Sequence, residues 1–159
     1  VCPPPPWVTI FNVFRGNWFE GCAIGIHFTG GSESNIMSGN TFLNSQNQVK
    51  YVGTRWVEWS DNGVGNFWSD NPAFDLNGDG ISENSYKPND LVDQMIWRHP
   101  FAKSLLTSPT VKMLRWAQGQ FPALYPGGVI DSNPLMVPHQ PILPTLWAVN
   151  AQAEIGEIR

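Results

Sequence analysis

Charged residues are scarce in this sequence, and none of them forms a run of one sign. Asp, Glu, Lys and Arg make up 14% of the 159 residues, and thirteen acidic residues against nine Lys and Arg give a net charge of −4. A protein that follows nucleic-acid phosphates needs clustered positive charge. We therefore do not expect nucleic acid to be a partner.

Long hydrophobic runs are also missing. No stretch approaches the ~20 apolar residues that a helix needs to cross a bilayer. The sequence begins VCPPPPWVTIF, which has no basic residue and holds four prolines that disfavour a helix. A secretory signal peptide has a basic start and a continuous apolar segment, so we expect no export signal in these residues.

Cysteine is rare as well, since Cys2 and Cys22 are the only two in the chain. Two cysteines make neither a disulfide framework nor a zinc-binding pattern. They can pair in an oxidising compartment or remain free. Because a disulfide requires a geometry that sequence spacing does not guarantee, we favour two free thiols.

Apolar and aromatic side chains are what the sequence has in quantity. Hydrophobic residues make up 42% of the chain, with eight Trp and nine Phe. This is enough to build one domain with a core, and it argues against wholesale disorder. Aromatic side chains bury large areas and are also enriched at interfaces.

A repeat is the clearest pattern along the chain. The motif Gly-Asn-x-aromatic occurs at residues 16–19, 39–42 and 65–68, which are 23 and then 26 residues apart. This period is typical of one rung of a parallel β-helix. Glycine permits the corner, and asparagine amides can bond to one another between rungs.

The repeat makes two specific predictions. The asparagines of the motif should occupy equivalent corners, and the aromatic side chains should point inward and form a stacked column. The asparagines are Asn17, Asn40 and Asn66, and the aromatic residues are Phe19, Phe42 and Trp68. The alternative is that Gly-Asn is a common turn dipeptide that recurs here by chance.

These patterns predict an all-β fold with a C-terminal helical hairpin and an extended tail. About three β-helix rungs occupy residues 1–70, an Asp/Asn-rich loop residues 71–90, a helical cap residues 91–125 and a Pro-rich tail residues 126–159. The first rung would be an open end, so we expect further rungs before it. We expect the cap to cover the other end of the β-helix.

Helix-capping residues place the two helices of the hairpin. Asp90 or Asn89 can cap a helix over residues 91–98. Ser108 followed by Pro109 is a strong start for a second helix that runs to residue 120.

One loop has the spacing of a calcium site. Its sequence D-x-N-x-D-G-x-x-E places oxygen ligands at alternate positions around a sharp turn at Gly80. The predicted ligands are Asp75, Asn77, Asp79, Glu83 and the carbonyl of Ile81. Tyr86 stands where a helix–loop–helix site has its last carboxylate, so another residue would have to complete the shell. The alternative is a loop that is held by its own Asx turns.

Four longer segments carry a resemblance to a known family. The chain resembles the C-terminal part of the NosD family over residues 12–138, through the segments GNWFEGCAIGIHF, GNFWSDNPAFDLNGDGIS, PNDLVDQMIWRHP and LRWAQGQFPALYPGGVIDSNPLM. The repeats alone would indicate only the broader CASH-domain class of β-helices, which includes carbohydrate-binding and sugar-hydrolysing proteins.

The resemblance implies a right-handed parallel β-helix in the periplasm. It implies association with an ABC transporter that consists of a permease and an ATPase. It also implies transient copper binding and a role in the maturation of nitrous oxide reductase during denitrification, together with a copper-chaperone lipoprotein.

Copper needs soft ligands such as methionine, cysteine and histidine. Met95 and His99 are four residues apart on the predicted helix, so they share a face and are our candidate copper ligands. The alternative is that Met95 packs in the core and His99 bonds locally beside Pro100.

The helical region holds more aromatic residues than a small cap can bury. We expect residues 91–136 to form a docking surface for the transporter, with Trp97, Arg98, Arg115 and Trp116 as its main residues. The alternative is that all the aromatic side chains of this region, including Phe101, Phe121 and Tyr125, are buried.

Motifs for catalysis are missing. No nucleophile elbow, Ser-His-Asp set or phosphate loop occurs, and the neighbouring acids Glu58 and Asp61 lie near the end of a strand. We therefore expect no enzyme activity. A carbohydrate-binding or carbohydrate-processing β-helix protein remains the alternative function.

Overall fold

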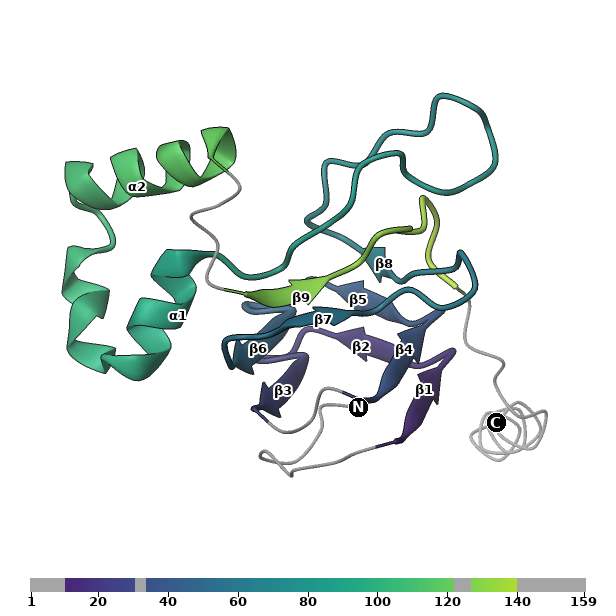
Figure 1. The fold of residues 1–159 in the computed structure, drawn as a ribbon, viewed down its shortest axis with the longest axis horizontal. Helices are drawn as coiled ribbons and strands as arrows, with labels where there is room; N and C mark the ends of the chain where they lie inside the picture. Colours follow the sequence, from purple (N-terminus) through teal and green to yellow (C-terminus); the bar gives the residue numbers. More distant parts are fainter. Residues whose placement is uncertain (1–10, 31–33, 122–126, 140–159) are drawn as a thin grey trace, which may run out of the picture.

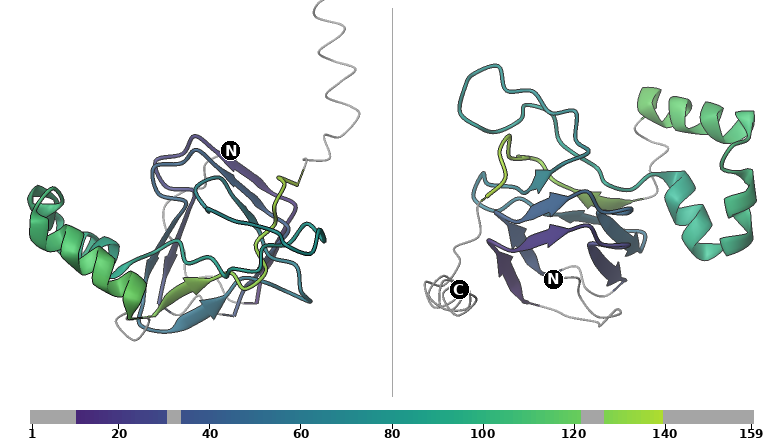
Figure 2. Two further views of the ribbon diagram at one scale, coloured as in Figure 1. Left: turned by 90° about the horizontal axis from the view of Figure 1, so that it is seen from above. Right: turned by 180° about the vertical axis from the view of Figure 1, so that it is seen from behind.

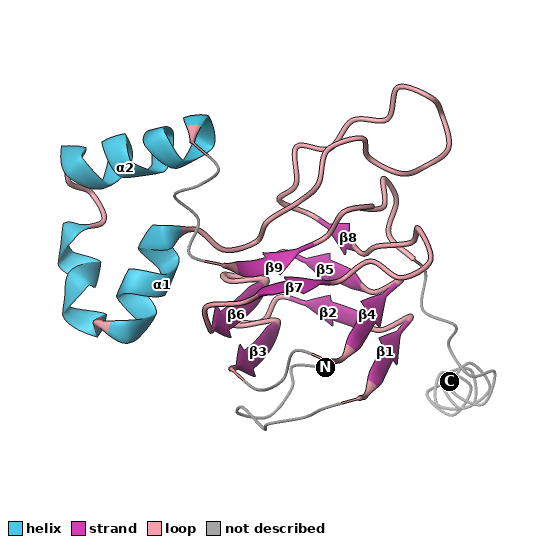
Figure 3. Cartoon of the chain, in the orientation of Figure 1, coloured by secondary structure: helices cyan, strands magenta, loops and turns pink. Residues whose placement is uncertain are grey.

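The structure is a computed structural model, which describes residues 11–30, 34–121 and 127–139. Its strands are short, and its three helices follow one another in the chain (Figure 3). The strands are β1 (Val13–Arg15), β2 (Trp18–Glu20), β3 (Ile26–Thr29), β4 (Ile36–Ser38), β5 (Thr41–Leu43), β6 (Val49–Val52), β7 (Trp56–Glu58), β8 (Phe67–Trp68) and β9 (Gly128–Ile130). The helices are α1 (Leu91–Arg98), a 3₁₀ helix (Pro100–Leu105) and α2 (Pro109–Gln120).

Parallel pairing stacks these strands in layers. β1 pairs with β4, β2 with β5, and β3 with β6, and each pair joins residues 23 positions apart. The chain therefore retraces one path from one layer, or rung, to the next. Seen from above, the strands surround a common interior (Figure 2, left). This mostly-β arrangement is compatible with a parallel β-helix.

The predicted asparagine ladder is confirmed. The side-chain amide of Asn17 donates to Oδ1 of Asn40 at 2.9 Å, and that of Asn40 donates to Oδ1 of Asn66 at 2.9 Å. The backbone N–H of the same donor residue bonds to the same oxygen in each step. Asn40 and Asn66 have no exposed surface, so these bonds are needed to satisfy buried polar groups.

The predicted aromatic column is confirmed as well. The ring centroids of Phe19 and Phe42 lie 4.9 Å apart, and those of Phe42 and Trp68 lie 4.4 Å apart, with nearly parallel planes. Phe42 is fully buried at the centre of the column. Trp59 stacks beside it, and Tyr86 packs on the far side of Trp68. This column is the middle of the hydrophobic core.

The chain after residue 126 differs from the extended tail that the sequence indicated. β9 pairs with β7 and so joins the stacked layers. The next residue, Asp131, ends the asparagine ladder by accepting bonds from the backbone N–H of Asn66 at 2.7 Å and from Nε1 of Trp68 at 2.8 Å. Burial raises the pKa of Asp131 to about 6, although the hydrogen bonds from Trp68 and Asn66 oppose that change.

The helices begin where the sequence predicted, but they do not cover an end of the rungs. Asp90 caps α1 in a capping box with Asp93, and Ser108 caps α2 with Pro109 in its first turn. Both helices project to the side of the stacked strands (Figures 1 and 2). β9 belongs to the last layer of strands, and the loop of residues 71–90 lies beyond that layer, where the cap was expected (Figure 1).

The expectation of free thiols is wrong, because Cys22 is disulfide-bonded. Its side chain is buried. The other cysteine, Cys2, lies outside the described residues. Spacing could not predict this bond, since a disulfide requires a geometry that spacing does not fix.

Candidate functional site

The largest departure from the stacked strands is the helical arm, which we define as residues 91–121. Arg115 on α2 holds the arm together, because its guanidinium contacts Asp90 at 2.9 Å and Asp93 at 3.4 Å. Burial and the neighbouring charge of Asp90 raise the pKa of Asp93. The buried side chain of Gln118 accepts a bond from the N–H of Leu91 at 3.3 Å, which joins α2 to the start of α1.

The outer surface of the arm is apolar over much of its length. Phe101 is 95% exposed, Trp116 67% and Phe121 60%, so the alternative in which all these aromatic side chains are buried does not hold. Trp97 is half-buried, and Arg98 and Arg115 are exposed. Tyr125 lies outside the described residues.

An apolar groove of about 330 Å³ runs between α1 and α2. It is lined mainly by aliphatic side chains, namely Val92, Met95, Ile96, Ala102, Leu105, Val111 and Leu114. Exposed aromatic residues and an open groove on one element are features of protein-binding surfaces. The predicted docking residues Trp97, Arg98, Arg115 and Trp116 lie on this arm, and their role in docking stays a prediction.

The predicted calcium loop folds around Asp75. Its carboxylate accepts bonds from the N–H of Gly78 at 2.6 Å and of Gly80 at 2.8 Å. The bond from Gly80 is the largest cause that holds the pKa of Asp75 below its ordinary value. The side chain of Asp79 accepts from the N–H of Ile81, and that of Glu83 from the N–H of Leu76. Within the described ranges, no three acidic, histidine or cysteine side chains are grouped to hold a metal.

These bonds are those of the Asx-turn alternative, and the calcium site stays a prediction. We expect calcium at 100 times its Kd to raise the free energy of unfolding by about 2.7 kcal/mol. Chemical denaturation with calcium and with a chelator measures this. The Asp79→Ala variant should lose the gain, and Glu20→Gln, a carboxylate change outside the loop, should keep it. Equal denaturation curves with calcium and with the chelator would show that the loop is a turn without a calcium site.

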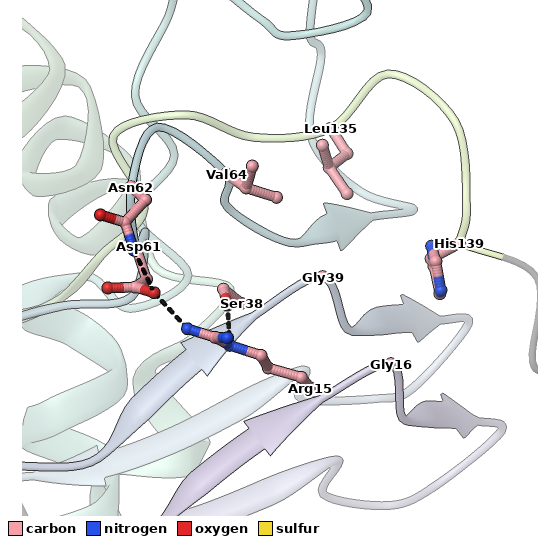
Figure 4. Close-up of a pocket in the computed structure, with 9 residues that line it drawn as sticks. All are labelled: Arg15, Gly16, Ser38, Gly39, Asp61, Asn62, Val64, Leu135 and His139. Atoms are coloured by element: carbon pink, nitrogen blue, oxygen red, sulfur yellow. Dashed lines mark hydrogen bonds and ion pairs between the residues drawn. The ribbon is translucent and has the colours of Figure 1, made fainter.

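A second hollow, of about 490 Å³, lies where the layers meet the last described residues (Figure 4). Arg15 forms an ion pair with Asp61 across it and donates from Nε to the hydroxyl of Ser38 at 3.1 Å. Asn62 donates to the same carboxylate at 2.9 Å, and His139 faces the backbone at Gly16. This hollow has no signal in the sequence, because its residues come from distant segments.

Four polar residues of this hollow are bonded to one another, namely Arg15, Ser38, Asp61 and Asn62. Glu58 is engaged elsewhere, by Ser60 and by the hydroxyl of Ser132 at 2.6 Å. The two acids that were near in sequence, Glu58 and Asp61, therefore have separate partners. The hollow offers no acid–base pair of the kind that glycoside hydrolysis uses.

Comparison with known proteins shows the family of the chain. A family profile described as periplasmic copper-binding protein (NosD) matches residues 9–73. A protein named probable ABC transporter binding protein NosD, from Stutzerimonas stutzeri, is 48% identical over 128 residues, which is 80% of this chain. One of the same name from Pseudomonas aeruginosa is also 48% identical over 128 residues. The chain belongs to the NosD family.

This NosD chain spans less than a third of the length of those two relatives, with 29% of the first and 30% of the second covered. Among its described residues, no helix is both long and apolar enough to cross a membrane.

The candidate copper ligands of this NosD chain lie on the arm. Met95 is half-exposed on α1, and His99, also exposed, follows the end of that helix, with its backbone N–H bonded to the carbonyl of Met95 at 2.8 Å. Met113 is exposed on α2. Thioether and imidazole groups suit copper, but no three histidine, cysteine or acidic side chains are grouped to hold a metal in the described part of the chain. The copper site at Met95 and His99 stays a prediction.

Proposed function

We propose that this chain is the docking segment of a periplasmic, non-enzymatic accessory protein. The full protein would have a right-handed parallel β-helix as its body. It would work with the permease and ATPase of an ABC transporter, with a copper-chaperone lipoprotein, and with nitrous oxide reductase, whose copper sites it helps to mature. The carrying observation is the helical arm, which projects from the strands with its aromatic residues exposed.

Several observations support this proposal. The two relatives are named as ABC transporter binding proteins, and the family is described as periplasmic and copper-binding. A disulfide at Cys22 fits an oxidising compartment such as the periplasm. Arg98 and Lys103 place positive charge on the arm of an otherwise acidic chain, which would orient a partner as it approaches.

Copper would be cargo that passes over the arm rather than a resident cofactor. Met95 and His99 would supply the soft ligands from one end of α1. Titration with Cu(I) tests this, because Met95→Leu and His99→Ala should each weaken binding. Met37→Leu is a matched control, since that methionine is buried in the core. Equal binding of Cu(I) by all three variants would show that the copper ligands are other residues.

Capture of the transporter permease by the full-length parent protein tests the docking role. We expect Trp116→Ala and Phe101→Ala to reduce capture at least tenfold together, because exposed aromatic residues often dominate binding energy. Leu76→Ala is the control, since Leu76 is 81% exposed but lies on the calcium-loop segment. Arg115→Glu would also break the contacts with Asp90 and Asp93, so it is the less specific probe.

Two results would count against the docking role. One is undiminished capture by the Trp116 and Phe101 variants when their thermal melts match the unaltered protein. The other is an equal loss with Leu76→Ala.

The hollow that contains Arg15 and Asp61 keeps a carbohydrate function as the second candidate. Retention on polysaccharide or release of reducing ends would favour it. Because Arg15, Ser38, Asp61 and Asn62 are bonded to one another there, we rank it below the docking role.

A further inference from the structure

A third pocket, of about 290 Å³, lies between the helical arm and the side of the stacked strands. Lys50 of β6, Lys103 of the 3₁₀ helix and Arg115 of α2 all line it. The chain has nine lysines and arginines in all, so a third of them meet at one pocket of an acidic protein. We propose that this pocket binds a carboxylate side chain of an acidic peptide segment in a partner protein.

The first support is that two of the three cations in the pocket have no ion-pair or hydrogen-bond partner among the described residues. Arg115 is already paired with Asp90 and Asp93. Neither ammonium group of Lys50 or Lys103 has an ion-pair or hydrogen-bond partner in the part of the chain that the structure describes. Asp93, which lines the pocket too, is engaged by Arg115 and by the N–H of Asp90. Two cations are thus left to attract an anion.

The second support is where the cations come from. Lys50 lies beside His27 on the adjacent strand, and burial, together with the charge of Lys50, lowers the pKa of that histidine. Lys103 comes from the arm instead. A carboxylate between the two lysines would therefore bond to both the arm and the strands, and it would relieve two positive charges that face the same space.

The third support concerns which anion fits. Phosphate sites commonly use a free arginine fork or a row of unbonded backbone N–H groups. The arginine here is occupied, and the N-terminus of α1 is already capped by Asp90. Apart from Asn47, the other walls are apolar, from Ile24, Ile96, Trp97 and Leu106. Such walls suit the methylene groups of an acidic residue and an apolar neighbour in a peptide.

The volume of the pocket also favours a peptide side chain. A pocket of about 290 Å³ is at the lower limit of those that enclose a drug-sized ligand. It can take a side chain from a peptide that runs across its mouth. The site is a property of this chain, whether or not the transporter is the partner.

Fluorescence anisotropy with a short labelled peptide of alternating glutamate and leucine tests the inference on the intact chain. The peptide should bind saturably, and the same peptide with glutamine for glutamate should bind at least tenfold more weakly. The double variant with glutamine at positions 50 and 103 should bind the peptide roughly tenfold more weakly. This corresponds to about 0.7 kcal/mol for each lysine–carboxylate pair that is lost. Raised salt should weaken it further.

Matched variants separate charge from folding. Lys112→Gln removes one positive charge from the arm away from the pocket and should leave binding unchanged. Arginine at positions 50 and 103 keeps both charges and should retain most of the affinity. Equal binding of the glutamate and glutamine peptides, or an equal loss with Lys112→Gln, would overturn the proposal. Displacement of the peptide by inorganic phosphate but not by acetate would also overturn it, in favour of a phosphate site.

Discussion

Replacing Phe42 with alanine should lower the free energy of unfolding by about 3–5 kcal/mol, because it leaves a cavity in a rigid core. Phe42 is fully buried, and its ring stacks between Phe19 at 4.9 Å and Trp68 at 4.4 Å. Equilibrium denaturation in urea, followed by tryptophan fluorescence, measures the change.

Phe19→Ala is the matched control for this prediction. Phe19 belongs to the same column but is 8% exposed and has a described aromatic neighbour on one side alone. Its replacement should be less destabilising than that of Phe42. If the two substitutions had equal and small effects, the column would not be the centre of the core.

Replacing Asp131 with alanine should be about as damaging, with an expected loss of about 3–5 kcal/mol, since each buried donor left without a partner costs about 1–3 kcal/mol. The carboxylate accepts from the backbone and side chain of Asn66 and from the indole of Trp68, all of them buried. Thermal and urea denaturation of the variant measure the loss.

Asparagine at position 131 keeps an acceptor, so Asp131→Asn should lose much less stability at neutral pH. The same variant tests the effect of the charge on Asp131, because asparagine does not ionise.

Burial raises the pKa of Asp131 from 3.8 to about 6, so the folded state holds the proton more tightly than the unfolded state. The protonated form therefore stabilises the fold below about pH 4, and this contribution is lost as the pH rises through about 6.

The unaltered protein should accordingly lose about 2 kcal/mol relative to Asp131→Asn between pH 4 and pH 6.5, because a tenfold difference in proton affinity between the folded and unfolded states is worth about 1.4 kcal/mol and this window holds most of the change. Comparing the two proteins cancels the titration of other groups. A difference that stays constant over this range would show that burial does not perturb Asp131.

The stacked part of the fold was predictable because its information is repeated in the sequence. Each Gly-Asn-x-aromatic motif specifies a corner, a ladder position and an inward ring, and three copies specify the stack. The helix starts were predictable for a similar reason, since Asp90 and Ser108 act on backbone groups within three residues.

The last layer was not predictable by these means. Asp131 lies 65 residues from Asn66, and it takes a position in the ladder that asparagine occupies in each motif before it. β9 has three residues, too few to show an alternating pattern among the surrounding prolines. The position of the helices depended on that layer, because β9 and the loop before α1 occupy the end that a cap would cover.

The candidate site was predictable in part. An excess of aromatic residues indicated that some of the helical region is exposed, and Phe101, Trp116 and Phe121 are. The pocket of Lys50, Lys103 and Arg115 had no sequence signal, because Lys50 is far in the chain from the other two cations and meets them only when the arm lies beside β6. The bond at Cys22 likewise depends on a contact that spacing does not encode.

The copper content of nitrous oxide reductase is the most direct measure of the proposed role. The reductase would be purified from cells whose full-length accessory protein carries Trp116→Ala and Phe101→Ala, and compared with cells that carry Leu76→Ala. We expect copper-depleted reductase with the arm variants, at normal accessory-protein levels, and full loading with the control. Fully loaded reductase in both strains would contradict the claim that the helical arm serves copper-site maturation.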